Sequence, residues 1–217
     1  ISFMLDKAEE HIFGFCILND WSARDIQAWE YQPLGPFLAK NFATTISPWI
    51  ITMEAMAPFR QRMFQRPDGD PNPLGYLTSD KHTENGGLGI NLEVAISTLQ
   101  MRKNGDAPHV IGLPTFDGMY WSVFQMLAHH ASGGCDLRPG DFYGSGTISG
   151  TEKDQLGSLL EVTRGGKDII ELPNGEERTF LEDYDEVIMR AWCEKEGAAR
   201  IGFGECRSII LPASELT

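Results

Sequence analysis

Residues 19–40 bring together side chains that could bind or transform a small polar molecule. Asp20, Arg24, Gln27 and Tyr31 are separated by four, three and four positions, and in an α-helix this spacing places them on one face. A carboxylate, a guanidinium, an amide and a phenol offer four different hydrogen-bonding groups to a ligand. Lys40 follows a proline-stiffened turn and could return its ammonium to the same region. The spacing by itself also fits an ordinary surface helix, in which Asp20 is the N-cap and Arg24 forms a surface ion pair.

The elements around these residues follow from the local pattern of apolar and turn-forming residues. The apolar run at 12–18 predicts a buried strand, and Asp20 and its polar neighbours can start a helix after it. The helix is expected over 23–31, because the proline at position 33 cannot continue it. A β-branched and aromatic strand is expected at 43–52.

The remainder of the chain is mostly β in pattern, with one long helix. The clearest strand is expected at 87–100, where apolar and polar side chains alternate. Apolar residues spaced by three and four predict an amphipathic helix over 115–131, which Gly133 and Gly134 end. Further strands are expected at 141–146, 158–163, 167–172, 178–181, 186–193 and 206–211. This pattern predicts a β-rich α+β fold, a sandwich, barrel or roll with few helices.

Composition limits the classes of function. The chain has 217 residues, enough for one substantial core, and its 18 Lys and Arg against 31 Asp and Glu give a net charge of −13. This charge repels nucleic acid, so no nucleic-acid partner is expected. No apolar run approaches the roughly 18 residues needed to span a bilayer, so no membrane partner is expected. The four cysteines lie far apart and are expected to be free thiols.

Longer motifs carry a specific resemblance. The stretch NDWSARDIQAWEYQPLGPFLAK at 19–40, followed by TTISPWI, resembles the signature of the fumarylacetoacetase family. The agreement extends to MYWSVFQMLAHH at 119–130, LRPGDFYGSGTISG at 137–150, GSLLE at 157–161 and RIGFGEC at 200–206. The wider superfamily shares the NDxSARDxQ core but usually not the WEYxPLGPF continuation. Because the resemblance covers essentially the whole chain, we expect 1–217 to be a catalytic domain of the C-terminal type that lacks an N-terminal portion.

The resemblance implies a fold and a reaction. The fold is a mixed β-sandwich roll of the fumarylacetoacetase C-terminal type. The reaction is hydrolysis of a carbon–carbon bond in a β-diketo acid, 4-fumarylacetoacetate, which gives fumarate and acetoacetate in the last step of tyrosine and phenylalanine catabolism. The resemblance also implies Mg²⁺ or Ca²⁺ as the cofactor, a homodimer and a cytoplasmic location.

The same resemblance assigns roles to residues near the first motif. Asp20 matches a carboxylate ligand of the catalytic cation. Arg24, Gln27 and Lys40 match groups that stabilise the developing oxyanion and carbanion. Lys40 and Thr44 also match a second, structural Mg²⁺ site, to which a lysine would contribute its backbone carbonyl. Without the resemblance, strand propensity explains Thr44 and a solubilising surface role explains Lys40.

Further roles fall later in the chain. Gln27, Tyr31 and Thr147 match substrate-binding residues, and Thr147 lies in a glycine-rich turn that a ligand can approach closely. Glu161 matches the carboxylate that orients and polarises a general-base histidine, although its local pattern alone indicates a solvent-facing strand residue. If these roles are right, Arg24 and Glu161 meet around one pocket.

Two features depart from the family. Its base histidine lies upstream of the NDWSARD motif, where this chain has 18 residues. None of the five histidines of the chain matches that position: His11, His82, His109, His129 and His130. His129 and His130 are expected to pack or cap at a helix end. One carboxylate is too few for a cation that takes six or more oxygens. We therefore expect the 217 residues alone to be inactive. Two alternatives stay open: a superfamily enzyme acting on an acylpyruvate or oxaloacetate, and an inactive binding module.

Overall fold

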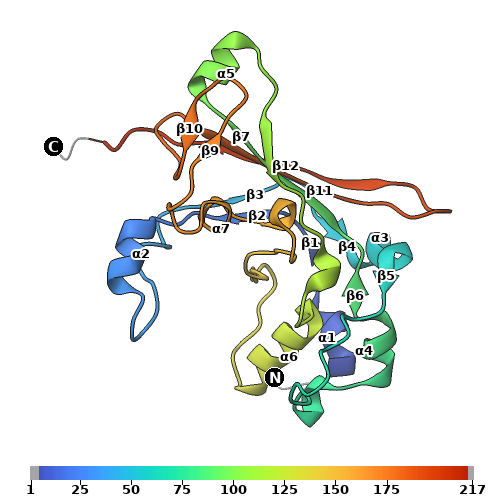
Figure 1. Cartoon of the computed structure of the whole chain (residues 1–217). Coiled ribbons are helices and arrows are strands. Elements are labelled where there is room, and N and C mark those ends of the chain that lie inside the picture. Colours follow the sequence, from blue (N-terminus) through green and yellow to red (C-terminus); the bar gives the residue numbers. More distant parts are fainter. Residues whose placement is uncertain (1–4, 215–217) are drawn as a thin grey trace.

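The largest sheet has four antiparallel strands in the order β12-β11-β7-β8. Its strands are β7 (Asn91–Ser97), β8 (His109–Gly112), β11 (Glu186–Cys193) and β12 (Ile201–Ile209). A computed structural model describes residues 5–214, and Figure 1 shows this sheet in the upper half of the molecule. Arg190 on the central strand β11 bridges Glu93 on β7 and Glu205 on β12, with N–O distances of 2.5 and 2.7 Å. These cross-strand ion pairs support the register of the sheet.

Four two-stranded antiparallel sheets surround the large one. They pair β1 (Gly14–Phe15) with β4 (Ile51–Thr52), β2 (Leu18–Asp20) with β3 (Thr44–Ile46), β5 (Arg60–Gln61) with β6 (Gly87–Leu88), and β9 (Ile170–Glu171) with β10 (Glu177–Arg178). The described chain is therefore a mixed α/β structure with several small antiparallel sheets. The fold class predicted from the sequence is confirmed at this coarser level.

Seven α-helices and five 3₁₀ turns complete residues 5–214. The α-helices are α1 (Leu5–Ala8), α2 (Arg24–Glu30), α3 (Met53–Met56), α4 (Asp80–Asn85), α5 (Leu99–Asn104), α6 (Val123–Ser132) and α7 (Leu159–Val162). The 3₁₀ turns are η1 (Glu9–His11), η2 (Ala57–Phe59), η3 (Gly75–Leu77), η4 (Phe116–Gly118) and η5 (Lys153–Gln155). Figure 1 shows α1, α4 and α6 together in the lower half, whereas α2 and the loop after it project at the left.

Two clusters of buried side chains hold these elements together. The first lies between the large sheet and the small sheets and contains Ile17, Met56, Phe59, Leu88, Ile90, Phe116, Ala191, Cys193, Phe203 and Cys206. The second packs α1 against α6 and contains Leu5, Ala8, Leu77, Phe124 and Ala128. Burial of this apolar surface is the main favourable contribution to folding.

Several predicted elements are confirmed, some with shorter bounds. Strand β11 matches the predicted 186–193. The strand predicted at 87–100 is divided into β6 and β7 and stops at Ser97, because the Thr98 hydroxyl caps α5 by accepting from the backbone of Met101 at 3.1 Å. The helix predicted at 115–131 begins only at Val123, because Ser122 caps it with a capping box. It ends at Ser132, before the glycines that the sequence indicated.

Other predicted strands are wrong or much reduced. Residues 158–163, expected to be a strand, contain helix α7. Within the described chain, residues 141–146 form no regular strand, and the apolar run at 12–18 yields only the short strands β1 and β2. The predicted strands at 167–172 and 178–181 shrink to β9 and β10, and the one expected at 206–211 is the end of β12.

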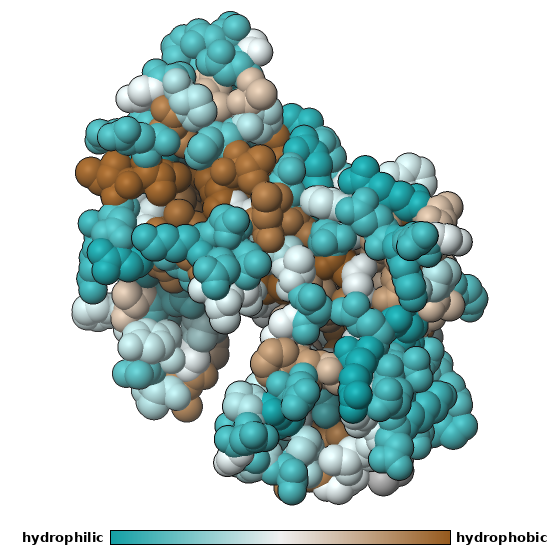
Figure 2. Space-filling view, turned by 45° about the vertical axis from the view of Figure 1, so that its right-hand side comes forward, coloured by the Kyte–Doolittle hydropathy of each residue, from teal (hydrophilic) through white to brown (hydrophobic). Residues whose placement is uncertain are grey.

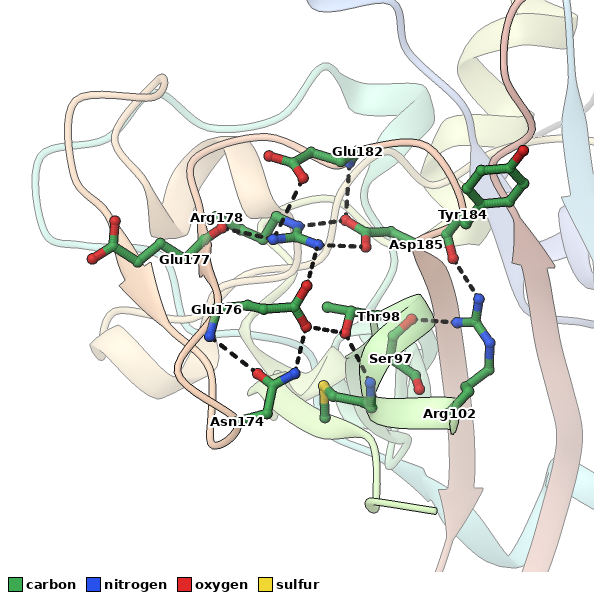
Figure 3. A network of polar contacts seen from close by, with 11 residues as sticks. Ser97, Thr98, Arg102, Asn174, Glu176, Glu177, Arg178, Glu182, Tyr184 and Asp185 are labelled. Carbon is green, nitrogen blue, oxygen red and sulfur yellow. Dashed lines mark hydrogen bonds and ion pairs between the residues drawn. The ribbon is translucent and has the colours of Figure 1, made fainter. Parts of the chain in front are cut away.

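A buried polar network holds the β9–β10 hairpin against α5 and the start of β11 (Figure 3). Arg178 forms a bidentate ion pair with Asp185: Nε donates to Oδ2 at 2.7 Å and Nη2 donates to Oδ1 at 2.9 Å. The same guanidinium approaches Glu176, whose carboxylate accepts hydrogen bonds from Thr98 and Asn174. Charged groups this deep require such pairing, because an unpaired buried charge is costly.

Two further predictions from the sequence concern membrane-spanning segments and the state of the cysteine thiols. Within residues 5–214 no helix combines the length and the apolar character that a membrane crossing requires. The four cysteines are free, as predicted: Cys193 and Cys206 are buried, Cys16 is half-buried and Cys135 is exposed.

Candidate functional site

The small sheet formed by β2 and β3 carries the first candidate residues. Asp20 lies at the end of β2, directly opposite Thr44 on β3. The prediction that Asp20 belongs to the helical face of Arg24 and Gln27 is therefore wrong, because the strand continues through Asp20 and the helix begins at Arg24. The predicted N-cap is also wrong, since Ala23 occupies that position and makes no side-chain cap.

Side-chain hydrogen bonds anchor this small sheet to the large one. The Thr45 hydroxyl accepts from Trp21 Nε1 at 2.9 Å and lies 3.0 Å from Ser208 Oγ on β12. Gly204 on β12 has a φ of +75°, and a Cβ there would lie 2.4 Å from the Trp49 ring, so the close approach requires glycine. The segment carrying Asp20 and Thr44 is thus held at a defined place beside β12.

Lys40 returns to Asp20, as its position after the turn predicts. Its Nζ donates to Asp20 Oδ2 at 2.7 Å, with the two side chains 27% and 52% exposed. A pair this exposed contributes little to stability. It does fix an ammonium and a carboxylate at one point of the surface, where both remain accessible to a ligand.

Helix α2 places a cation beside this pair. Arg24 donates from Nη1 to Gln27 Oε1 at 2.8 Å. Partial burial lowers the pKa of Arg24, and the negative charges of Asp20 and Glu161 act in the opposite direction. Glu161, remote in sequence, therefore lies close enough for its charge to act on this guanidinium. This electrostatic influence agrees with the expected proximity of Arg24 and Glu161, and their sharing of one pocket stays a prediction.

Tyr31 and Thr147 are less enclosed. Tyr31 is the C-cap of α2 and is 48% exposed, so it borders the region of Arg24 and Gln27. Thr147 is exposed and follows Gly146, whose φ is +79°. Its Cγ2 lies 3.2 Å from where a Cβ on Gly157 would stand, so the turn carrying Thr147 packs closely against the chain just before α7.

Two serine hydroxyls hold the carboxylate of Glu161. Ser149 Oγ lies 2.9 Å from both carboxylate oxygens, and Ser158 Oγ donates to Oε2 at 2.6 Å. Ser158 is also the N-cap of α7 and accepts from the backbone of Glu161 at 3.4 Å. A carboxylate bound from two sides has a defined orientation. It is well suited to orient a further group, such as an imidazole.

The sequence assigned no role to Ser149, Ser158 or Glu30. A signal for α7 was present, since Ser158 followed three positions later by Glu161 has the S-x-x-E form of a capping box. The carboxylate of Glu30 accepts hydrogen bonds from the backbone N–H groups of Phe37, Leu38 and Ala39. No local pattern reveals that interaction, because it closes a loop of irregular structure.

The residues present fit a divalent cation only in part. Asp20 offers one carboxylate and Thr44 a hydroxyl on the facing strand. Among residues 5–214, no cluster of three or more His, Cys, Asp and Glu side chains could hold a metal ion. Hard cations such as Mg²⁺ and Ca²⁺ take six or more oxygen ligands, so these residues supply part of a site and not a complete ligand set.

Three of the described histidines make specific side-chain contacts. His82 Nε2 lies 3.0 Å from Ser122 Oγ, and His129 Nδ1 lies 2.7 Å from the Tyr76 hydroxyl. His130 packs edge-on against the Tyr143 ring at 4.9 Å. The packing roles expected for His129 and His130 at the end of α6 are confirmed.

Comparisons with known proteins agree with the motifs. The family model described as "Fumarylacetoacetate (FAA) hydrolase C-terminal" matches residues 3–210. The chain is 51% identical over 212 residues to the fumarylacetoacetase of Caenorhabditis elegans, covering 96% of this chain and 47% of that protein. It is 48% identical over 209 residues to that of Homo sapiens and 49% over 210 residues to that of Arabidopsis thaliana, with the same coverage of 96% and 47%. The chain thus spans about half the length of the curated relatives it matches. It matches the C-terminal domain model of the fumarylacetoacetate hydrolase family and belongs to that family.

Proposed function

We propose that this chain forms the C-terminal catalytic region of an enzyme that hydrolyses 4-fumarylacetoacetate to fumarate and acetoacetate, the final step of tyrosine and phenylalanine catabolism. The observation that carries the proposal is the Lys40–Asp20 pair, together with Arg24, on whose guanidinium the charges of both Asp20 and Glu161 act. Relatives named fumarylacetoacetase at 46–51% identity support the substrate.

The proposed reaction requires water to attack a carbonyl and a carbanion to leave as an enolate. Positive charge and hydrogen-bond donors lower the energy of both negatively charged species. Arg24 and Lys40 would supply the cations, with Gln27 donating from its amide. Glu161, bound by Ser149 and Ser158, would orient the imidazole that activates the water.

The substrate contacts belong to the same proposal. Gln27 and Tyr31 would bind the β-diketo acid from α2, and Thr147 would approach it from the glycine-rich turn. Tyr31 and Thr147 are both exposed, which leaves their hydroxyls accessible to a ligand. An anionic substrate is compatible with the net charge of −13 only because two cations stand at the site itself.

A divalent cation, Mg²⁺ or Ca²⁺, is the proposed cofactor. Asp20 would provide one carboxylate ligand, and Thr44 with the backbone carbonyl of Lys40 would contribute to a second, structural site. When bound, such a cation would polarise the diketone oxygens as a Lewis acid. The Lys40 ammonium already bound to Asp20 at 2.7 Å supports the view that this carboxylate attracts positive charge.

The assembly and location form the last part of the proposal. We propose a cytoplasmic homodimer with the β-sandwich roll of its family, without nucleic-acid or membrane partners. Trp29 and Leu34, at and after the end of α2, are 91% and 81% exposed, and Figure 2 shows hydrophobic residues in a band across the upper half of the visible face. Exposed apolar area of this kind is typical of surfaces that another protein covers.

Turnover of 4-fumarylacetoacetate by the natural full-length protein tests the proposal. Lys40→Met and Arg24→Gln are each expected to lower kcat by about 10²–10³, the effect of removing one group that stabilises an oxyanion. Lys103→Met, which removes an exposed lysine on α5, is the matched control. Wild-type turnover in the two site variants would contradict the assigned roles. Preferential turnover of an acylpyruvate or oxaloacetate would replace the proposed substrate.

A further inference from the structure

The carboxylate of Glu30, the last residue of α2, binds three consecutive backbone amides. Its Oε1 accepts from Phe37 N and Ala39 N, both at 2.7 Å, and its Oε2 accepts from Leu38 N at 3.3 Å. Adjacent N–H groups that point at one anion form an anion-binding nest. These bonds lower the pKa of Glu30, that from Ala39 foremost, so the carboxylate is charged at neutral pH.

The nest lies at the start of the turn that carries Lys40. Within this turn the backbone N–H groups of Lys40 and Asn41 both donate to Phe37 O at 3.1 Å. Ala39, which is fully buried, accepts from Ala23 N at 3.0 Å just before α2. Glu30 and Ala23 therefore hold the turn from the two ends of the same helix, and Lys40 is the residue directly after the nest.

We infer that Glu30 is a positioning residue for Lys40, holding its turn so that the ammonium meets Asp20 instead of moving freely in solvent. Lysine has a long side chain with many rotamers, and fixing it carries an entropic cost. The exposed ion pair with Asp20 is too weak to fix the backbone by itself. The relevance to catalysis rests on the role proposed above for Lys40, whereas the positioning itself does not.

Acylation of lysines by an amine-reactive reagent, quantified peptide by peptide by mass spectrometry on the natural full-length protein, reports the positioning directly. In the wild type, Lys40 is expected to react slowly because its ammonium is bound to Asp20. Glu30→Gln retains one acceptor oxygen and Glu30→Ala removes both. Labelling of Lys40 should therefore rise severalfold in the first variant and further in the second. The rate at Lys103 should not change in either variant.

Two further variants separate positioning from a general charge effect. Asp25→Asn removes a negative charge from the same helix without touching the nest, since its carboxylate accepts only from Ile26 N in the described contacts. It should leave the labelling of Lys40 at the wild-type rate. Glu30→Asp keeps the charge on a shorter side chain and should restore part of the protection.

The inference is overturned if Lys40 reacts at the wild-type rate in both Glu30→Gln and Glu30→Ala, or if Asp25→Asn accelerates it equally. Labelling decides the matter whether or not the protein hydrolyses the diketone. Failure of the proposed function would instead appear as wild-type turnover in Lys40→Met. If both ideas are right, Glu30→Gln also lowers kcat, and Glu30→Asp recovers part of it.

Discussion

Replacement of Asp185 by asparagine should destabilise the chain strongly, because it leaves a buried guanidinium without its main partner. The side chains of Asp185 and Arg178 are only 1% and 7% exposed. Asp185 accepts two hydrogen bonds from Arg178, and its Oδ2 also accepts from Glu182 N at 2.9 Å. These bonds raise the pKa of Arg178 in the wild type. The arginine stays charged in the variant as well, because a guanidinium is protonated at any ordinary pH. Asparagine keeps the shape of the side chain but brings no negative charge.

The expected size follows from the surroundings of Arg178. Removing one partner of a buried ion pair costs about 3–5 kcal/mol. Two carboxylates remain near the guanidinium, Glu176 at 3.5 Å and Glu182 at 3.6 Å, with side chains 32% and 66% exposed. They compensate in part, so we expect the lower end, about 3 kcal/mol. Glu182→Gln is the matched control, because it removes an exposed carboxylate from the same arginine and should cost less than about 1 kcal/mol.

Urea unfolding followed by circular dichroism measures both variants. The midpoint for Asp185→Asn should fall well below that of the wild type at an unchanged slope, since the slope reports the surface exposed on unfolding. The midpoint for Glu182→Gln should stay close to the wild type. Equal shifts in the two variants, or a loss below about 1 kcal/mol for Asp185→Asn, would refute the assignment of this pair as a buried ion pair.

Three further predictions concern pH, backbone contact and the Glu161 carboxylate. Burial lowers the pKa of His82 from 6.5 to about 4, so the stability contributed by neutral His82 should be complete above pH 6.5 and decline towards pH 4. The urea midpoint should therefore depend less on pH across this range in His82→Gln than in the wild type. The same pH dependence in both proteins would refute this prediction. Gly157→Ala would place a methyl 2.0 Å from Ile148 O and should lower the melting temperature, whereas a wild-type value would show that the backbone yields. Ser149→Ala removes a hydroxyl from Glu161 and, under the proposed function, should lower kcat for 4-fumarylacetoacetate more than it raises KM in the natural full-length protein. This effect is absent if the serine is only structural.

The features predicted well from the sequence are those with local causes. Strand β11 was predicted with its bounds, because Val187, Ile188 and Trp192 favour a strand and turns flank the segment. The course of α2 up to Glu30 was predicted, since the following proline ends it. The family was recognisable from motifs along the whole chain, and the match over residues 3–210 confirms it.

The errors arise where short elements compete. Residues 158–163 have apolar and β-branched side chains typical of a strand, but the Ser158 hydroxyl caps a helical turn there. The four residues of α7 are too few for periodicity to distinguish helix from strand. Asp20 was assigned to a helix because it is a good N-cap residue, whereas pairing with Thr44 extends the strand through it. In both places contacts made by neighbouring segments decided between two local tendencies.

The sequence by itself determined the chemical types available, the family and the approximate order of strands and helices, because these depend on residue identity and short-range periodicity. Only the tertiary structure decided which groups meet: Lys40 with Asp20, and Glu30 with the amides of residues 37–39. It also brings the charge of Glu161 within electrostatic range of Arg24. Such meetings depend on strand pairing and loop closure between distant segments. No local pattern encodes that geometry, because it is the packing of the whole chain that brings these segments together.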